Sequence, residues 1–172
     1  MKSIKEQLIL HEGLELKPYK CTADKWTIGV GRNLEDKGLD EEEIQYLLHN
    51  DSDNYFNTST MLLESSRDIS KGITREEALY LLERDLEGIE TDLEKYSWYN
   101  ELNKVRQKVI IDMVFNLGLS GFLSFKNTIQ AIKDKDYKLA AKEMEDSRWY
   151  RQVGNRSKRL VKMMRTGEDY TK

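Results

Sequence analysis

Apolar side chains near the start of the chain repeat at helical spacing. Positions 4, 8 and 9 are Ile, Leu and Ile, which share one face of a helix. Ser3 followed by Glu6 is a capping-box pattern, and Gly13 is a residue type that commonly ends a helix. The pattern therefore predicts a helix over residues 3–12, with Glu12 in its last turn.

After this helix, the spacing of apolar residues changes from one typical of a helix to one typical of strands. Leu16–Thr22 and Lys25–Gly31 read as two strands, and Ala23-Asp24-Lys25 lies near the turn between them. The second segment contains good strand residues, and its two glycines indicate a bend or a close backbone approach. We expect a hairpin whose tip lies opposite the end of the first helix.

An internal repeat follows the hairpin. Residues 37–51 read KGLDEEEIQYLLHND and residues 71–85 read KGITREEALYLLERD, an offset of 34 with eight of fifteen positions identical. Each copy begins with a helix-capping pattern, Asp40 with Glu43 and Thr74 with Glu77. Two copies are too few for a solenoid, so we interpret them as a local duplication within one lobe.

The rest of the chain is helical in pattern. Apolar residues recur at spacings of three and four through the segments 74–95, 102–117, 122–134, 136–148 and 155–165. The sequence predicts an α+β protein that is mostly α, with one small antiparallel sheet. Residues 13–73 form an N-terminal lobe with the sheet and the duplication, 74–95 a connecting helix, and 96–172 a helical lobe packed with helix 3–12.

Composition narrows the class of protein. The single cysteine, Cys21, excludes an internal disulfide and a cysteine-rich zinc site. The chain has two histidines and no HExxH motif, which argues against a catalytic metal site. We therefore expect no cofactor. The first ten residues carry charges, so we expect no signal peptide, and no run of 18 apolar residues predicts a membrane span.

Charge is distributed unevenly along the chain. Residues 1–103 hold 12 Lys and Arg against 23 Asp and Glu, a net −11, while residues 104–172 hold 16 against 8, a net +8. The basic part indicates either a solvated surface or a site for an anionic polymer. No nucleic-acid module is recognisable, so nucleic acid is not the expected partner.

Three residues are candidates for chemistry. Glu12 is followed after eight residues by Cys21 and after five more by Thr27. A carboxyl group can donate a proton, a thiolate can act as a base or nucleophile, and a hydroxyl can hold a water. A Cys–His hydrolase that uses Cys21 with His11 or His49 is an alternative without a supporting motif.

Several segments resemble one family. HEGLELKPYKCTADKWTIGVGRNL (residues 11–34) resembles the active-site segment of phage-type lysozymes, the T-even-like muramidases and endolysins of glycoside hydrolase family 24. VRQKVIIDMVFNLGLSGFLSFKNTI (105–129), SRWYRQVGNRSKRL (147–160) and MMRTGE (163–168) resemble its later segments in order. The resemblance implies the two-lobed lysozyme-like fold.

The resemblance also implies roles for individual residues. Glu12 is the general acid, Cys21 occupies the position where many members carry Asp, and Thr27 positions water for attack with inversion, which corresponds to catalytic groups about 6.5–9.5 Å apart. Substrate contacts are implied for Gly31, Phe115, Asn116, Thr128 and Arg148.

Structural support is implied for three further residues. Arg156 is expected near Glu12, and Arg32 is expected to pair with an acidic residue at a helix end. The duplication offers Asp51 and Asp85 for that pair, and we favour Asp85 because its helix continues into the connector.

The function implied is that of an endolysin, a bacteriolytic and antimicrobial hydrolase of the β-1,4 bonds between N-acetylmuramic acid and N-acetylglucosamine in peptidoglycan. We expect a monomer that acts without nucleic acid or membrane insertion and is made in the host cytoplasm, reaching the periplasm or wall after a holin opens the membrane. The alternatives are a wall-binding relative with weak or no catalysis and a virion-borne lysozyme, against which the short chain argues.

Overall fold

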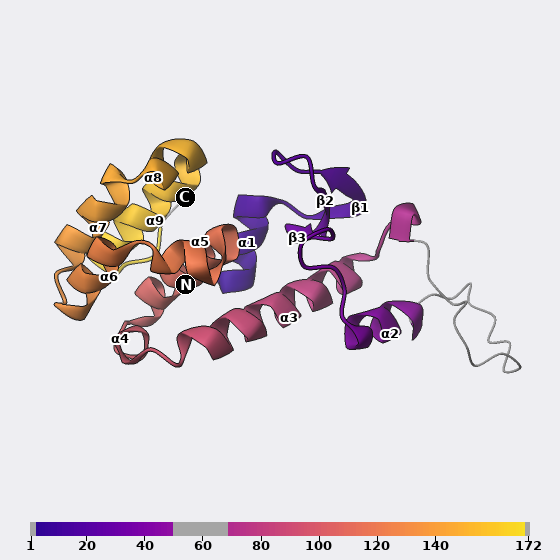
Figure 1. The fold of residues 1–172 in the computed structure, drawn as a ribbon, viewed down its shortest axis with the longest axis horizontal. Coiled ribbons are helices and arrows are strands. Elements are labelled where there is room, and N and C mark those ends of the chain that lie inside the picture. The colour runs from indigo at the N-terminus through magenta and orange to yellow at the C-terminus, as the bar shows by residue number, and fades with distance from the viewer. Residues whose placement is uncertain (1–2, 50–68, 171–172) are drawn as a thin grey trace, which may run out of the picture. The chain divides into compact units, whose positions relative to one another are not determined.

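The computed structural model describes residues 3–49 and 69–170 (Figure 1). Helices predominate, and the strands form one three-stranded antiparallel sheet, which confirms the predicted mostly α member of the α+β class. The chain divides into two compact units. Within the described residues, one unit comprises 8–49 and 69–84, and the other comprises 3–7 and 85–170.

The first helix, α1 (Ile4–Glu12), has both predicted ends. The Ser3 amide donates to Glu6 Oε2 at 2.8 Å, and the Glu6 amide donates to Ser3 Oγ at 3.1 Å, so the capping box is formed. Gly13 has φ +81° and donates its amide to the Ile9 carbonyl at 2.9 Å. This left-handed termination places Glu12 as the last helical residue.

The sheet has the order β1 (Glu15–Lys20), β2 (Trp26–Gly29), β3 (Arg32–Asn33). The predicted hairpin is confirmed, and the third strand was not predicted. In the β1–β2 ladder Tyr19 lies opposite Thr27, and the register is irregular between Glu15 and Tyr19. Pro18 lies within this irregular part of an edge strand, where its missing N–H is tolerated.

The two copies of the duplication pack on each other. They form α2 (Glu41–His49) and the start of α3 (Arg75–Leu93), and a short 3₁₀ turn, η1 (Ile69–Lys71), precedes the second copy. Tyr46 and Tyr80, which are equivalent in the repeat, stack with ring centroids 3.7 Å apart. The equivalent Leu47 and Leu81 are buried in one core beneath the sheet residue Ile28. Equivalent residues of the two repeat copies thus pack together in one core.

The helical unit contains six further helices: α4 (Ser97–Asn100), α5 (Lys104–Leu123), α6 (Lys126–Lys133), α7 (Tyr137–Asp146), α8 (Arg148–Val153) and α9 (Asn155–Thr166). Helix α7 packs against α6 and α9, and α5 also packs against α9 (Figure 1). Gly118 adopts φ +73° and kinks α5 where the sequence predicted a helix end. No single helix among the described residues meets the length and apolarity needed to cross a membrane; the bent pair α5–α6 meets them only together.

Candidate active site

The three catalytic candidates belong to the sheet-containing unit. Glu12 ends α1 and is half-buried, Cys21 begins the turn after β1, and Thr27 lies on β2 with 3% of its surface exposed. The turn is closed by two backbone hydrogen bonds, from the Cys21 amide to the Lys25 carbonyl at 3.0 Å and from the Asp24 amide to the Cys21 carbonyl at 2.8 Å. Asp24 adopts φ +57°, a left-handed conformation that aspartate tolerates better than most residues.

Cys21 is a free thiol that is surrounded by hydrogen-bond donors. The backbone amides of Lys25 and Ala23 and the Thr27 hydroxyl hold its pKa below the ordinary value for a thiol, and partial burial acts in the opposite direction. Each donor stabilises the thiolate more than the thiol. The turn therefore increases the fraction of Cys21 that is ionised near neutral pH.

The Thr27 hydroxyl has two possible acceptors for its one hydrogen. It lies 3.1 Å from the Lys25 carbonyl oxygen and also hydrogen-bonds to Cys21. When Cys21 is a thiolate, the charged sulfur is the stronger acceptor. In either arrangement the oxygen keeps lone pairs that can accept a hydrogen bond from water, which is the chemistry a water-positioning residue needs.

Tyr19 lies near the Cys21–Thr27 pair and within the influence of the Glu12 charge, and the sequence analysis did not single it out. It faces Thr27 across the β1–β2 ladder. Burial raises the pKa of its phenol, and the charges of Glu12, Cys21 and Glu15 raise it further. Glu12 and Cys21 therefore lie close enough to Tyr19 to act on the same hydroxyl. The signal was present in the period of the strand, because residues 19 and 21 share one face.

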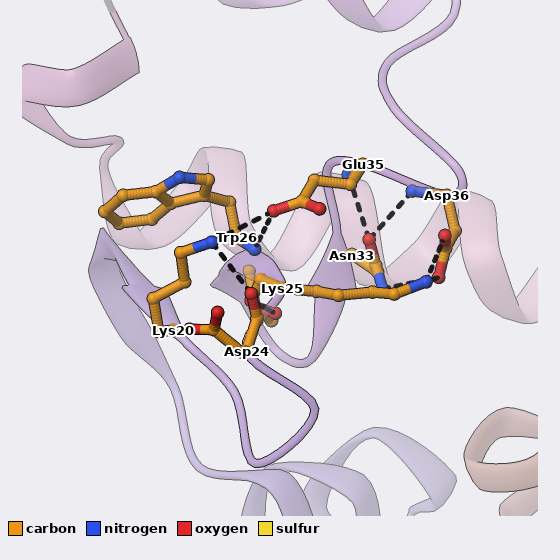
Figure 2. A network of polar contacts seen from close by, with 8 residues as sticks. Lys20, Asp24, Lys25, Trp26, Asn33, Glu35 and Asp36 are labelled. Atoms are coloured by element: carbon orange, nitrogen blue, oxygen red, sulfur yellow. Dashed lines mark hydrogen bonds and ion pairs between the residues drawn. The ribbon is translucent and has the colours of Figure 1, made fainter.

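Polar contacts on the hairpin hold the turn to the chain beyond β3. The Lys20 ammonium lies 4.8 Å from the centroid of the Trp26 ring and 3.3 Å from Glu35 Oε1 (Figure 2). The same carboxylate oxygen accepts the Trp26 amide at 2.8 Å. That amide and Lys20 hold the pKa of Glu35 below its usual range.

A second set of contacts reinforces the same connection (Figure 2). Lys25 forms an ion pair with Asp36, which raises the pKa of the Lys25 ammonium. Asn33 Oδ1 accepts the amides of Glu35 and Asp36, both at 2.9 Å. The two lysines that flank the Cys21 turn, Lys20 and Lys25, are thus both paired with carboxylates of the segment after β3.

Arg32 forms a buried ion pair with Glu43, which the sequence indicated only as part of a helix cap. Its guanidinium donates to both carboxylate oxygens of Glu43 at 2.7 and 2.8 Å, with the side chains 1% and 3% exposed. It also donates to the carbonyl oxygen of Leu81 at 3.2 Å. Asp85 is buried in α3, and Asp51 lies outside the described residues. The predicted pairing of Arg32 with Asp85 stays a prediction.

Comparison with known proteins decides the family. The sequence model described as "Phage lysozyme" matches residues 10–167. The chain belongs to the phage lysozyme family.

Named relatives agree with this result. The lysozyme is 34% identical to "Probable T4-type lysozyme 1" of Dictyostelium discoideum, over 96% of this chain and 95% of that one. It is 29% identical to "Probable T4-type lysozyme 2" of the same organism, with the same coverage. It is also 30% identical to "Pre-baseplate central spike protein Gp5" of Enterobacteria phage T4, over 96% of this chain and 28% of that one. The chain is thus a muramidase-type peptidoglycan hydrolase with the expected lysozyme fold, and peptidoglycan is its substrate.

The helical unit of the lysozyme contains Arg156 in a buried network. Arg156 Nε donates to Asp112 Oδ1 at 2.7 Å, and Gln7 Nε2 donates to Asp112 Oδ2 at 2.7 Å. Asp112 is fully buried and Arg156 is 8% exposed. The network ties the first turns of α1 to α5 and α9. The predicted closeness of Arg156 to Glu12 stays a prediction.

The predicted substrate contacts of the lysozyme fall in both units. Gly31 forms the turn between β2 and β3 with φ +72°. On α5, Phe115 is half-buried and Asn116 is exposed. The side-chain oxygen of Asn116, Oδ1, accepts a hydrogen bond from the indole N–H of Trp149 in α8 at 2.9 Å. Arg148 is exposed at the start of α8, whereas Thr128 is only 1% exposed in α6. The surfaces of Asn116 and Arg148 suit a contact role, and the small surface of Thr128 does not.

The two histidines lie on different helices. Among the side chains that the structure describes in residues 3–48 and 69–170, no three of the types His, Cys, Asp and Glu gather as metal ligands would. His11 directly precedes Glu12 in the last turn of α1. His49 is the last residue of α2, in the first copy of the duplication.

Proposed function

We propose that this lysozyme cleaves the β-1,4 bond between N-acetylmuramic acid and N-acetylglucosamine with Glu12 as general acid, Cys21 as the second catalytic group and Thr27 as the residue that positions water. One arrangement carries the assignment. Glu12 ends α1 just before the hairpin, Tyr19 faces Thr27 across the β1–β2 ladder, and the charges of Glu12 and Cys21 both raise the pKa of the Tyr19 phenol. An acid, an ionisable thiol and a water-binding hydroxyl thus share one side of the hairpin.

The proposed step balances as a hydrolysis. Glu12 gives its proton to the glycosidic oxygen as the C1–O bond breaks, and water attacks C1 from the opposite face of the sugar. The water proton passes to the Cys21 thiolate, and the acid and thiol then exchange protons with solvent before the next turnover. Attack by water at this face inverts the anomeric configuration.

Two protonation states must coexist for this step. Glu12 must carry a proton while Cys21 has lost its own, although free thiols ionise at higher pH than carboxyl groups. The donors around Cys21 lower its pKa and therefore increase the population with this arrangement. The turn geometry supports the view that a thiol can replace a carboxylate at this position.

A cell-wall clearing assay tests the assignment. The parent clears a wall suspension, Glu12→Gln loses about 10²–10⁴-fold in rate as expected for loss of a general acid, Cys21→Asp retains clearing, and Cys21→Ala does not. Full activity in Cys21→Ala contradicts the role of the thiol. Product anomers followed by NMR should show inversion, and retention would point instead to direct attack by Cys21 on C1.

The same assay distinguishes the active enzyme from the alternative, a wall-binding relative with weak or no catalysis. A parent that sediments with walls without clearing them, and that becomes active as Cys21→Asp, is a relative that has lost its second catalytic group. Size-exclusion chromatography with light scattering tests the proposed monomer.

For the biological role, we propose an endolysin that is made in the host cytoplasm and reaches the wall after a holin opens the membrane. The match to the phage lysozyme family over residues 10–167 supports this role. The match to a baseplate spike protein favours a second candidate, a lysozyme carried by the virion. Immunodetection of the chain in purified particles favours the second role. Lysis by the expressed chain only when a holin is co-expressed favours the first.

A further inference from the structure

Tyr19 occupies a position that the catalytic assignment does not use. It lies on β1 directly opposite Thr27, and residues facing each other in an antiparallel ladder have their Cβ atoms about 4.5–5.5 Å apart. Cys21, which hydrogen-bonds to Thr27, lies two residues further along the chain on the same side. The ladder therefore places the Tyr19 side chain beside the two groups proposed to handle water.

The phenol is half-buried, yet the described residues provide its hydroxyl with no hydrogen-bond partner. Tyrosine hydroxyls that leave bulk water usually find one. A hydroxyl left open on the catalytic side of a sheet is available to a ligand.

The charge state of this hydroxyl is defined by its surroundings. Burial and the negative charges of Glu12 on α1, Cys21 in the turn and Glu15 on β1 raise its pKa, so it stays protonated in the neutral and mildly alkaline range. A protonated phenol donates a hydrogen bond, whereas a phenolate can only accept one. The sugar at the scissile bond offers acceptor oxygens on its hydroxyl, ether and acetamido groups.

We propose that the Tyr19 hydroxyl binds substrate by donating a hydrogen bond to an oxygen of the amino sugar held between Glu12 and Cys21. The inference rests on the proposed function, because the two catalytic groups of a glycosidase flank the scissile bond. Tyr19 faces Thr27 across the ladder and its pKa responds to the charges of both groups, so it lies on the side of the hairpin where that bond is proposed to bind. Tyr19 then fixes the orientation of the ring against Glu12 while Thr27 holds the water.

The test is Tyr19→Phe, which removes one oxygen and keeps the ring. On soluble peptidoglycan fragments we expect kcat/KM to fall about tenfold, the size of one hydrogen bond, with no change in the urea midpoint of unfolding. Tyr80→Phe, which removes a hydroxyl from the stacked pair in the same unit, is the matched control and should keep full activity. Activity of Tyr19→Phe within twofold of the parent overturns the proposal.

A second variant separates binding from packing. Site-specific fluorotyrosine at position 19 keeps the shape of the side chain but makes the phenol more acidic. If the hydroxyl must donate, Glu12→Gln protein that carries the fluorotyrosine loses its binding of peptidoglycan fragments at a lower pH than Glu12→Gln protein with tyrosine. An unchanged pH dependence of binding overturns the proposal. Glu12→Gln is measured alongside. If it is inactive while Tyr19→Phe is fully active, only this inference fails; if it is active, the catalytic assignment itself fails.

Discussion

The buried pair between Arg32 and Glu43 offers the sharpest test of the physical reasoning. The Glu43 carboxylate binds the guanidinium through both oxygens and also accepts the Asp40 amide at 3.0 Å, which completes the cap of α2. Glu43→Gln keeps the side-chain shape but removes the charge opposite Arg32. The substitution leaves a cation buried without this counterion.

The expected loss follows from burial. Removing one partner of a buried pair costs about 3–5 kcal/mol of the free energy of unfolding. We expect about 3 kcal/mol, the lower end of that range, because Arg32 keeps the carbonyls of Gly38 and Leu81 as acceptors. With a urea m-value of about 2 kcal/mol/M, the midpoint should fall by about 1.5 M.

The neighbouring Glu42 provides the control. Glu42 pairs with Arg84 at 2.8 Å, but its side chain is 74% exposed. Glu42→Gln should therefore cost less than about 1 kcal/mol. Urea unfolding followed by circular dichroism measures both variants. Equal losses in the two, or a loss under about 1 kcal/mol in Glu43→Gln, would refute the view that burial determines the strength of these pairs.

The pH dependence of the same pair has a defined sign. Burial raises the pKa of Glu43, but the hydrogen bonds from Arg32 and from the Asp40 amide lower it by more, so the folded pKa lies below the ordinary value. A carboxyl group with a lowered folded pKa contributes its full stability above the unfolded value of about 4.3 and loses it as pH falls through the folded pKa. The difference between parent and Glu43→Gln should shrink on acidification over that range.

Three further predictions concern other parts of the chain. Because the pKa of Cys21 is lowered, iodoacetamide should alkylate it faster at pH 7 than it alkylates free cysteine, and the rate should fall as acidification protonates the thiolate; equal rates at pH 7 contradict this. Gly72 has φ +107°, and an added Cβ would meet the Leu16 carbonyl oxygen at 2.8 Å, so Gly72→Ala should lower the melting temperature. Gly88→Ala, in an open helical position, should instead raise the free energy of unfolding by about 0.5–1 kcal/mol. Asp112→Asn should destabilise the fold by about 3 kcal/mol, since it removes the charge that pairs with the buried Arg156 guanidinium; a melting temperature like that of the parent contradicts this.

Short-range signals predicted much of the fold correctly. Both ends of α1 and the capping boxes of α2 and α3 involve residues within four positions of each other. The kink at Gly118 also follows from one residue that favours a left-handed conformation. In contrast, β3 has only two residues, too few for an alternating pattern to show, and α8 is a single short helix between two others.

The sequence by itself determined most of the elements, the hairpin turn and, through its resemblance to a family, the choice of Glu12, Cys21 and Thr27 as catalytic candidates. Hydrogen bonds between near neighbours and the periods of helix and strand are written into a few consecutive residues, so they can be read in order. The tertiary structure decided that Glu43 binds Arg32, that equivalent residues of the two repeat copies pack together, and that Tyr19 faces Thr27 across the sheet. These contacts depend on which of several similar side chains the folded backbone brings into reach, because a carboxylate gains a buried partner only where packing excludes water.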